Sequence, residues 1–147
     1  MNSYPKWWDD TITLYNKYED PVTNLVSWTR HTIENCFVKR ASNKAVIGQM
    51  VLESNVVIIR IRESDTYKTY AEWIQLPNDS KSQYFTVHSG DIVVFGAVDD
   101  NINEYTTGHR STDILSKYRG LDICCVVTAN SENVGNRTRP HYYVQGE

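Results

Sequence analysis

STDILSKYRGLDICCVVT, residues 111–128, contains the change from a helix pattern to a strand pattern that decides the fold. The hydroxyl group of Ser111 is a candidate N-cap for a helix. Three apolar residues recur on one side of such a helix: Ile114, Leu115 and Tyr118. Gly120 follows a basic last turn, where glycine commonly ends a helix. The pattern predicts a short helix over residues 111–120 and a buried strand over residues 121–128.

Outward from this segment, the chain reads as strands separated by turns. A polar loop over residues 129–139 precedes a last predicted strand over residues 140–146. The upstream strand patterns lie at residues 11–18, 26–31, 48–63 and 84–96, the last of these interrupted by a turn at Gly90 and Asp91. About six to eight short strands, with turns every ten residues or so, favour an all-β domain. We expect a mainly β fold, namely a small β-barrel or sandwich with long loops and one short helix in its C-terminal half.

Four segments between these strands are read less directly from the pattern. Residues 32–39 either continue the preceding strand or pair with it, and residues 41–44 are polar enough to predict a loop. Residues 70–76 fit a helical turn or a short strand, because periodicity does not separate the two. Residues 99–110 form a long predicted loop that is acidic at its start.

The alternation of side chains along a strand predicts which residues face the core. Residues 56–62 start with a continuous apolar run, which suggests burial on both faces, and then Arg60 and Arg62 alternate outward. Cys124 and Cys125 are neighbours on one predicted strand, so we expect one in the core and the other facing out or into an interface.

The composition is that of a globular chain with a mild acidic balance. The 147 residues fit a single domain, and we interpret residues 1–10 as an N-terminal extension of it. A net charge of −3 gives no basic footprint for sequence-independent binding to nucleic acid. Three cysteines form no disulfide framework, and no segment has the pattern of a signal peptide or a membrane span. We therefore expect a soluble chain made in a cytosol.

No spacing in the sequence predicts a metal site, a cofactor site or a catalytic site. The four histidines lack metal-ligand spacing with one another and with the cysteines: His31, His88, His109 and His141. Cys36 lies in an apolar strand, which predicts a buried and unreactive thiol. The carboxylates of Asp99, Asp100 and Glu104 lack the ligand spacing of a calcium loop. We expect no cofactor, no metal and no enzymatic activity.

A local basic and aromatic patch occurs near the C-terminus. Arg137 and Arg139 precede His141, Tyr142 and Tyr143. Such a patch is typical of sites that bind single-stranded nucleic acid, and arginine and tyrosine are also enriched at protein interfaces. Because the chain is acidic overall, the protein interface is the favoured interpretation. With the long loop added, the candidate interface residues are Asp99, Asp100, Glu104, Tyr105, His109, Arg110, Arg137 and Arg139.

Several motifs together resemble those of a known family. They are ITLYNKY with a following Asp-Pro (residues 12–21), WTR (residues 28–30), Trp73, FTVHSGDIVVFG (residues 85–96) and the closing PHYYVQG (residues 140–146). The chain resembles small proteins encoded among the head genes of tailed phages and prophages of Gram-positive bacteria, usually described as minor capsid or head-completion proteins.

That resemblance implies a structural role in the virion neck, assembled in the cytoplasm of the bacterial host. Such proteins form a ring that extends the channel for DNA. On one side the ring contacts the portal–adaptor complex, and on the other it contacts the tail, through a tail-terminator or another neck protein. The implied partners are further copies of the chain, those neighbouring neck proteins and packaged DNA that passes without specific binding, and no membrane is involved.

Two alternatives stay open at this point. One is a small β-barrel module that binds nucleic acid through Arg137, Arg139 and Tyr142, for which salt-dependent binding would be the evidence. The other is a small enzyme that uses Cys36 or the carboxylates of residues 99–104, although no spacing supports a mechanism.

Overall fold

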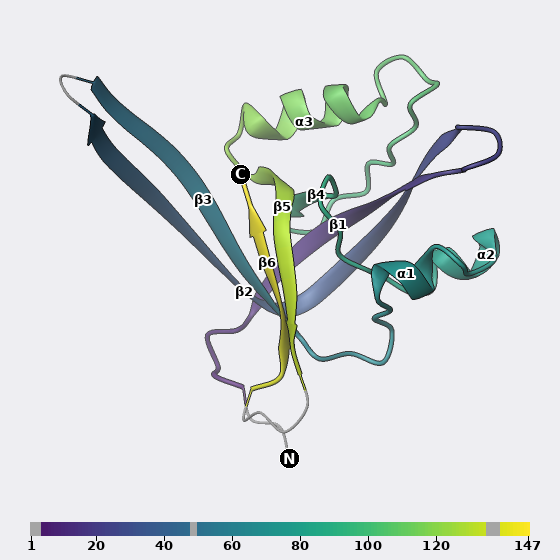
Figure 1. Ribbon diagram of the computed structural model, residues 1–147, viewed down its shortest axis with the longest axis horizontal. Helices are drawn as coiled ribbons and strands as arrows, with labels where there is room; N and C mark the ends of the chain where they lie inside the picture. Colours follow the sequence, from purple (N-terminus) through teal and green to yellow (C-terminus); the bar gives the residue numbers. More distant parts are fainter. Residues whose placement is uncertain (1–3, 48–49, 135–138) are drawn as a thin grey trace.

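The computed structural model describes residues 4–47, 50–134 and 139–147 of the chain. Strands dominate it, with three short helices among the described residues, as Figure 1 shows. The elements in chain order are β1 (Asp10–Glu19), β2 (Val26–Ile47), β3 (Met50–Arg62), α1 (Tyr70–Trp73), α2 (Asn78–Lys81), β4 (Ile92–Phe95), α3 (Ser111–Arg119), β5 (Cys124–Asn133) and β6 (His141–Gly146).

The six strands form a closed barrel in the order β1-β2-β3-β6-β5-β4, and every pair is antiparallel. The fold is therefore mainly β and a small barrel, as the sequence predicted, and the sandwich alternative is wrong. Closure gives each strand a partner on both sides over at least part of its length.

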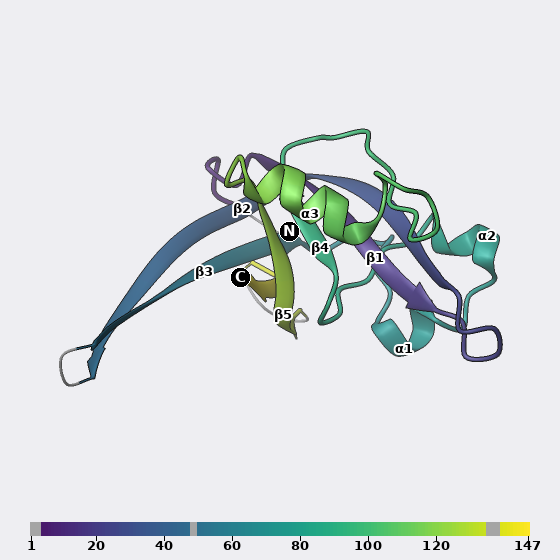
Figure 2. The same cartoon turned by 90° about the horizontal axis from the view of Figure 1, so that it is seen from above.

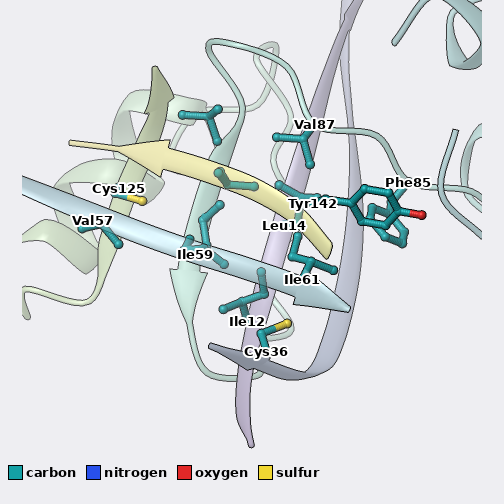
Figure 3. Packing of buried hydrophobic residues seen from close by; sticks show 13 residues of the cluster. Ile12, Leu14, Cys36, Val57, Ile59, Ile61, Phe85, Val87, Cys125 and Tyr142 are labelled. Atoms are coloured by element: carbon teal, nitrogen blue, oxygen red, sulfur yellow. The ribbon is translucent and has the colours of Figure 1, made fainter. Parts of the chain in front are cut away.

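The core of the barrel consists of residues that alternate along its strands (Figure 3). On β3 the residues Val57, Ile59 and Ile61 are buried, whereas Val56 and Ile58 are only half-buried. The predicted burial of both faces of this strand is wrong, because only one face meets the barrel interior. The remaining buried members of this core are Ile12, Leu14, Cys36, Phe85, Val87, Val93, Cys125, Val127, Tyr142 and Val144.

A second apolar cluster lies between α3 and the outer face of the barrel. Ile114 and Tyr118 of the helix are buried against Tyr15 of β1 and Val94 of β4. Cys124 packs on this cluster, while its neighbour Cys125 is in the barrel core. The predicted opposite orientation of the two thiols is confirmed, and the outward one is covered by the protein's own helix.

The ends of α3 differ from the sequence prediction. The N-cap is Arg110, and its backbone N–H donates to Asp113 Oδ2 over 3.1 Å, so Ser111 is the first helical residue. At the other end Gly120 keeps a φ of −60°, and the left-handed residue is Asp122 at 58°. The strand begins only at Cys124, because residues 120–122 form a turn that reverses the chain after the helix.

Two predicted loops are partly strand. Residues 41–44 belong to β2, because each of them pairs with a residue of β3, and residues 129–133 extend β5 along β6. Backbone pairing outweighs local polarity in both places. β2 is one continuous strand from Val26, which confirms the first reading of residues 32–39, and α1 confirms the helical reading of residues 70–76.

The segment before β1 packs on the barrel from the first described residues onward. Trp8 is 4% exposed, and its ring lies 6.1 Å from that of Phe37 and 5.7 Å from that of His141. Tyr4 donates through its hydroxyl group to the carbonyl oxygen of Pro140 over 2.7 Å. Trp7 points outward with 63% of its surface exposed.

Candidate functional site

The acidic end of the loop between β4 and α3 is fixed to the body of the protein. Asp100 Oδ2 accepts hydrogen bonds from Tyr118 Oη and from Lys117 Nζ, the latter at 2.9 Å. Both donors lower the pKa of the Asp100 carboxyl, with the Tyr118 hydroxyl as the larger cause. The carbonyl oxygen of the same residue accepts from Tyr15 Oη over 2.6 Å. This carboxylate therefore anchors the loop on α3.

The rest of this loop presents the other predicted interface residues. Glu104 Oε1 accepts from the backbone N–H of Ser111 over 2.6 Å, so this side chain also has a structural role. Tyr105 is 61% exposed, and its hydroxyl oxygen accepts from the backbone N–H of Val26 over 2.8 Å. Three of the predicted residues are exposed on the same loop: Asp99, His109 and Arg110. Part of the loop surrounds a shallow hollow of about 380 Å³.

The predicted basic residues lie far from that loop. Arg139 is exposed and lies between the end of β5 and the start of β6. Its carbonyl oxygen accepts from His141 Nδ1 over 2.8 Å. Arg137 lies outside the described residues. Figure 1 shows the loop before α3 and the start of β6 at opposite ends of the barrel, so the predicted set forms two surfaces.

A basic and aromatic face that the sequence prediction missed lies on the outside of β3 and β6. The guanidinium of Arg60 lies 5.5 Å from the centre of the Phe37 ring, and that of Arg62 lies 4.7 Å from the Tyr4 ring. Arg60 pairs with Tyr143 across the strands. Residues 56–62 and 141–146 contain no aspartate or glutamate. The sequence shows the alternation of the arginines, but only the register places them beside β6.

Tyr142, which the sequence assigned to a basic surface patch, is instead a core residue. It is 6% exposed, and its ring is stacked on that of Tyr67 at 3.8 Å. Strand alternation puts Tyr143 on the outer face in its place. A nucleic-acid surface that uses Tyr142 is therefore wrong.

The Gly90 and Asp91 turn is structural, as the sequence predicted. Gly90 has a φ of 98°, which glycine adopts without strain. Asp91 is 1% exposed, and its carboxylate accepts from the backbone N–H groups of Lys17 and His88 at 3.0 and 2.9 Å. Burial raises the pKa of Asp91 to about 6, although the hydrogen-bond donors act in the opposite direction. The carboxylate joins β1 to the segment before β4.

Two residues considered for chemistry, Cys36 and His31, are shielded from solvent. Cys36 is fully buried, and burial raises the pKa of its thiol to about 12, so the thiol is protonated near neutral pH. Burial lowers the pKa of His31 to about 4. Among the described residues, no three side chains of the metal-binding types lie close enough to hold an ion. Within the same residues, no helix has the length and apolar character that a membrane crossing requires.

The largest departure from a compact barrel is a two-stranded ribbon. We use this name for residues 41–47 of β2 and 50–56 of β3, which pair from Ala41 with Val56 to Ile47 with Met50. β6 joins β3 only at Val57, and β1 pairs with β2 only up to Cys36. Within the described part of the chain, both outer edges of the ribbon therefore lack a strand partner. Figure 2 shows the ribbon curving away from the body.

A groove lies where β2 and β3 separate at the other end of their pairing. It has a volume of about 550 Å³. One wall is residues 30–35 of β2, and the other is residues 61–64 with residues 82, 83 and 85. The groove and the ribbon are thus two consequences of one feature, namely that β2 changes its partner strand part-way along.

One known family covers nearly all of these features, because its match spans residues 7–147. The chain belongs to DUF6751, a family of unknown function. The match includes the barrel, the ribbon and α3, so the architecture described above is the DUF6751 domain of this chain. No curated protein matches the chain, and no solved structure matches it.

Proposed function

We propose that this protein is a structural subunit of a bacteriophage virion neck, acting as a head-completion or head–tail connector protein. In this proposal copies of the chain form a ring between the portal–adaptor complex and the tail or another neck protein. The ring extends the channel through which packaged DNA passes. This function has the partners and the virion location that the motif resemblance implies.

The observation that carries the proposal is the ribbon projecting from a closed barrel. A two-stranded hairpin is at best marginally stable in water on its own. The ribbon has seven cross-strand pairs and no third strand, which favours binding of the ribbon to the surface of another subunit. At about 3.3 Å per residue, the seven residues of each strand span roughly 23 Å. A rigid barrel with an arm of this length is suited to contacting a neighbouring subunit.

The distribution of the other surfaces supports the same function. The acidic loop, with Asp99, Tyr105 and His109, lies beside α3, whereas exposed Arg139 lies just before β6. A ring subunit needs different surfaces for the neighbours on its different sides, because head-to-tail contacts use two unlike patches. A net charge of −3 gives DNA little reason to bind while it passes.

The test is a genetic deletion in the phage or prophage that encodes the chain. We expect the deletion to give DNA-filled heads and free tails in electron micrographs of lysates, and a wild-type copy supplied in trans to restore joined particles. As a matched variant, a two-residue turn replaces residues 42–55 and leaves the barrel strands intact. This variant should fold but fail to restore joining. Normal tailed virions from the deletion strain contradict the proposal.

The basic face on β3 and β6 favours a second candidate function, which is binding to nucleic acid. Arg60 and exposed Lys39 lie beside Phe37 and Tyr143, a combination that suits phosphates and unstacked bases. Fluorescence anisotropy with single-stranded DNA tests it. Binding that weakens steeply with salt, and that is lost in a K39Q/R60Q variant but not in R119Q on α3, supports this candidate. Absence of salt-dependent binding removes it.

A further inference from the structure

β2 leaves half of its length with a free edge. Residues 26–36 pair with β1, and residues 37–47 pair with β3. No strand among the described residues therefore pairs with the second side of residues 26–35. Backbone groups on such an edge can accept an additional strand, and proteins usually protect edges of this kind.

Two hydrogen bonds determine which backbone groups point outward from this edge. The N–H of Asp20 donates to the carbonyl oxygen of Leu25 over 2.9 Å, so the backbone groups of Leu25 point toward the β1 side. The N–H of Val26 donates to Tyr105 Oη over 2.8 Å, so the backbone groups of Val26 point away from β1. Because the direction alternates along an antiparallel strand, the outward residues that follow are Trp28, Arg30 and Thr32.

The surroundings of this edge also lack hydrogen-bond partners. Of the buried side-chain nitrogens without a partner among the described residues, three belong to this segment: Trp28 Nε1, Arg30 Nη1 and His31 Nε2. The groove of about 550 Å³ runs beside residues 30–35, and Thr32 is exposed. A free edge, a groove and two unpaired side-chain nitrogens, on Arg30 and His31, thus coincide on this part of β2.

The ribbon has the complementary property. Its outer edges are free over residues 41–47 and 50–56, so it can serve as the added strand. Figure 1 shows that the ribbon and the first half of β2 extend from opposite sides of the barrel. A subunit with an arm on one side and a receiving edge on the other makes head-to-tail contacts, which close into rings when the rotation permits.

We infer that the ribbon of one copy of this chain adds a strand to residues 28–32 of β2 in the next copy and that this pairing forms the ring. The inference rests on the proposed function for its ring, but the pairing itself is tested on the purified protein. The occupant of the groove is a second copy, because each free ribbon edge has seven residues and is long enough to pair with all of residues 28–32.

The experiment compares T32P with T32V by sedimentation velocity and native mass spectrometry. Proline removes the outward N–H of residue 32, which β1 does not use, whereas valine keeps that N–H and the β-branched shape. We expect the wild-type protein and T32V to associate as the concentration rises. T32P should associate at least about tenfold more weakly with an unchanged melting temperature, since one lost hydrogen bond and a steric block add up to that loss.

Hydrogen exchange on the wild-type protein tests the same pairing without a substitution. The amides of Trp28, Arg30 and Thr32 should exchange at least about tenfold more slowly in the assembled protein than in the monomer. The ribbon amides should become protected together with them. A T32P variant that does not fold leaves this measurement to decide.

Three results overturn the inference. The first is a wild-type chain that stays monomeric at every concentration, the second is association that T32P does not weaken, and the third is an assembly in which the three β2 amides exchange as in the monomer. If virion assembly requires this protein and the purified protein gives any of these results, the proposed function stands and the pairing is rejected. A strand from a different protein found in the groove rejects the second copy as the occupant.

Discussion

Asn16 Nδ2 donates to Asp91 Oδ2 over 2.9 Å, and both residues are almost completely buried, at 0% and 1% exposure. Asn16 also donates to the carbonyl oxygen of Thr86 over 2.6 Å, so these side chains join β1 to the segment before β4. This polar contact lies at the end of an otherwise apolar barrel interior. Its removal is therefore expected to cost more than a surface substitution.

Replacing Asp91 with alanine should lower the free energy of unfolding by about 3 kcal/mol or more. The change leaves Asn16 Nδ2 and the N–H groups of Lys17 and His88 without their acceptor, and each buried donor left unpaired costs about 1–3 kcal/mol. Denaturant unfolding measures the difference. The matched control is D99A in the exposed loop, which should stay within about 0.5 kcal/mol of the wild-type protein.

Asp91 and His31 should give the stability opposite dependences on pH. Burial raises the pKa of Asp91 to about 6 in the folded protein, so the folded state holds the proton more tightly, and this contribution is lost as the pH rises from about 4 to about 6. Burial lowers the pKa of His31 to about 4, so the unfolded state binds the extra proton, and stability rises between about pH 4 and 6.5.

Two variants separate these contributions in unfolding measured at steps of pH. Relative to the wild-type protein, H31F should gain stability as the pH falls from about 6.5 to about 4, and D91N should gain stability as the pH rises from about 4 to about 6. Each change should amount to about 3 kcal/mol, since one unit of pKa corresponds to about 1.4 kcal/mol and each pKa differs by somewhat more than two units. Parallel pH curves for both variants and the wild-type protein refute this account.

Replacing Gly146 with alanine should destabilise the barrel by about 1–3 kcal/mol. A Cβ atom at this position lies 2.7 Å from Cys125 Sγ and 2.9 Å from the carbonyl oxygen of Val126, so β5 or β6 has to shift. G120A is the control, because Gly120 has a helical φ of −60° and its added Cβ atom has 3.3 Å to the nearest carbonyl oxygen. Thermal unfolding should separate the two variants, and equal melting temperatures would show that the strands adjust freely.

Alanine substitutions in α3 should test whether this helix is part of the folded core or a docking element for a partner. Ile114 is 3% exposed, so I114A should cost about 2–5 kcal/mol, whereas L115A at a half-buried position should cost about 1 kcal/mol. A helix of nine residues is marginal alone and depends on this packing. A loss under about 0.5 kcal/mol for I114A in the isolated protein would assign the helix to a partner instead.

The sequence predicts the barrel because its strands have regular alternation and clear turn residues. The Ile59, Ile61 and Arg60, Arg62 alternation correctly gives the inner and outer faces of β3. Local patterns fail where long-range pairing decides, as in the ribbon, where residues 41–44 look like a loop but pair with β3. They also fail at Ser111, because Asp113 supplies the cap to the backbone of Arg110.

The candidate surfaces were predictable only in part, for the same physical reason. Residues that follow one another in a loop, such as Asp99 to Arg110, are seen together in the sequence. The placing of Arg60 beside Tyr143, and the free edge at Thr32, depend on which strands pair and in which register. No local signal carries that information, because the partners are distant along the chain.

Imaging of the virion neck tests the central claim most directly. Under the proposed function, purified virions whose genome encodes this chain should contain the protein, as detected by mass spectrometry. Cryo-electron microscopy of the neck should show a ring of six-stranded barrels with projecting ribbons around the DNA channel, between the portal and the tail. Tailed virions that lack this protein, with a neck accounted for by other chains, would contradict the account.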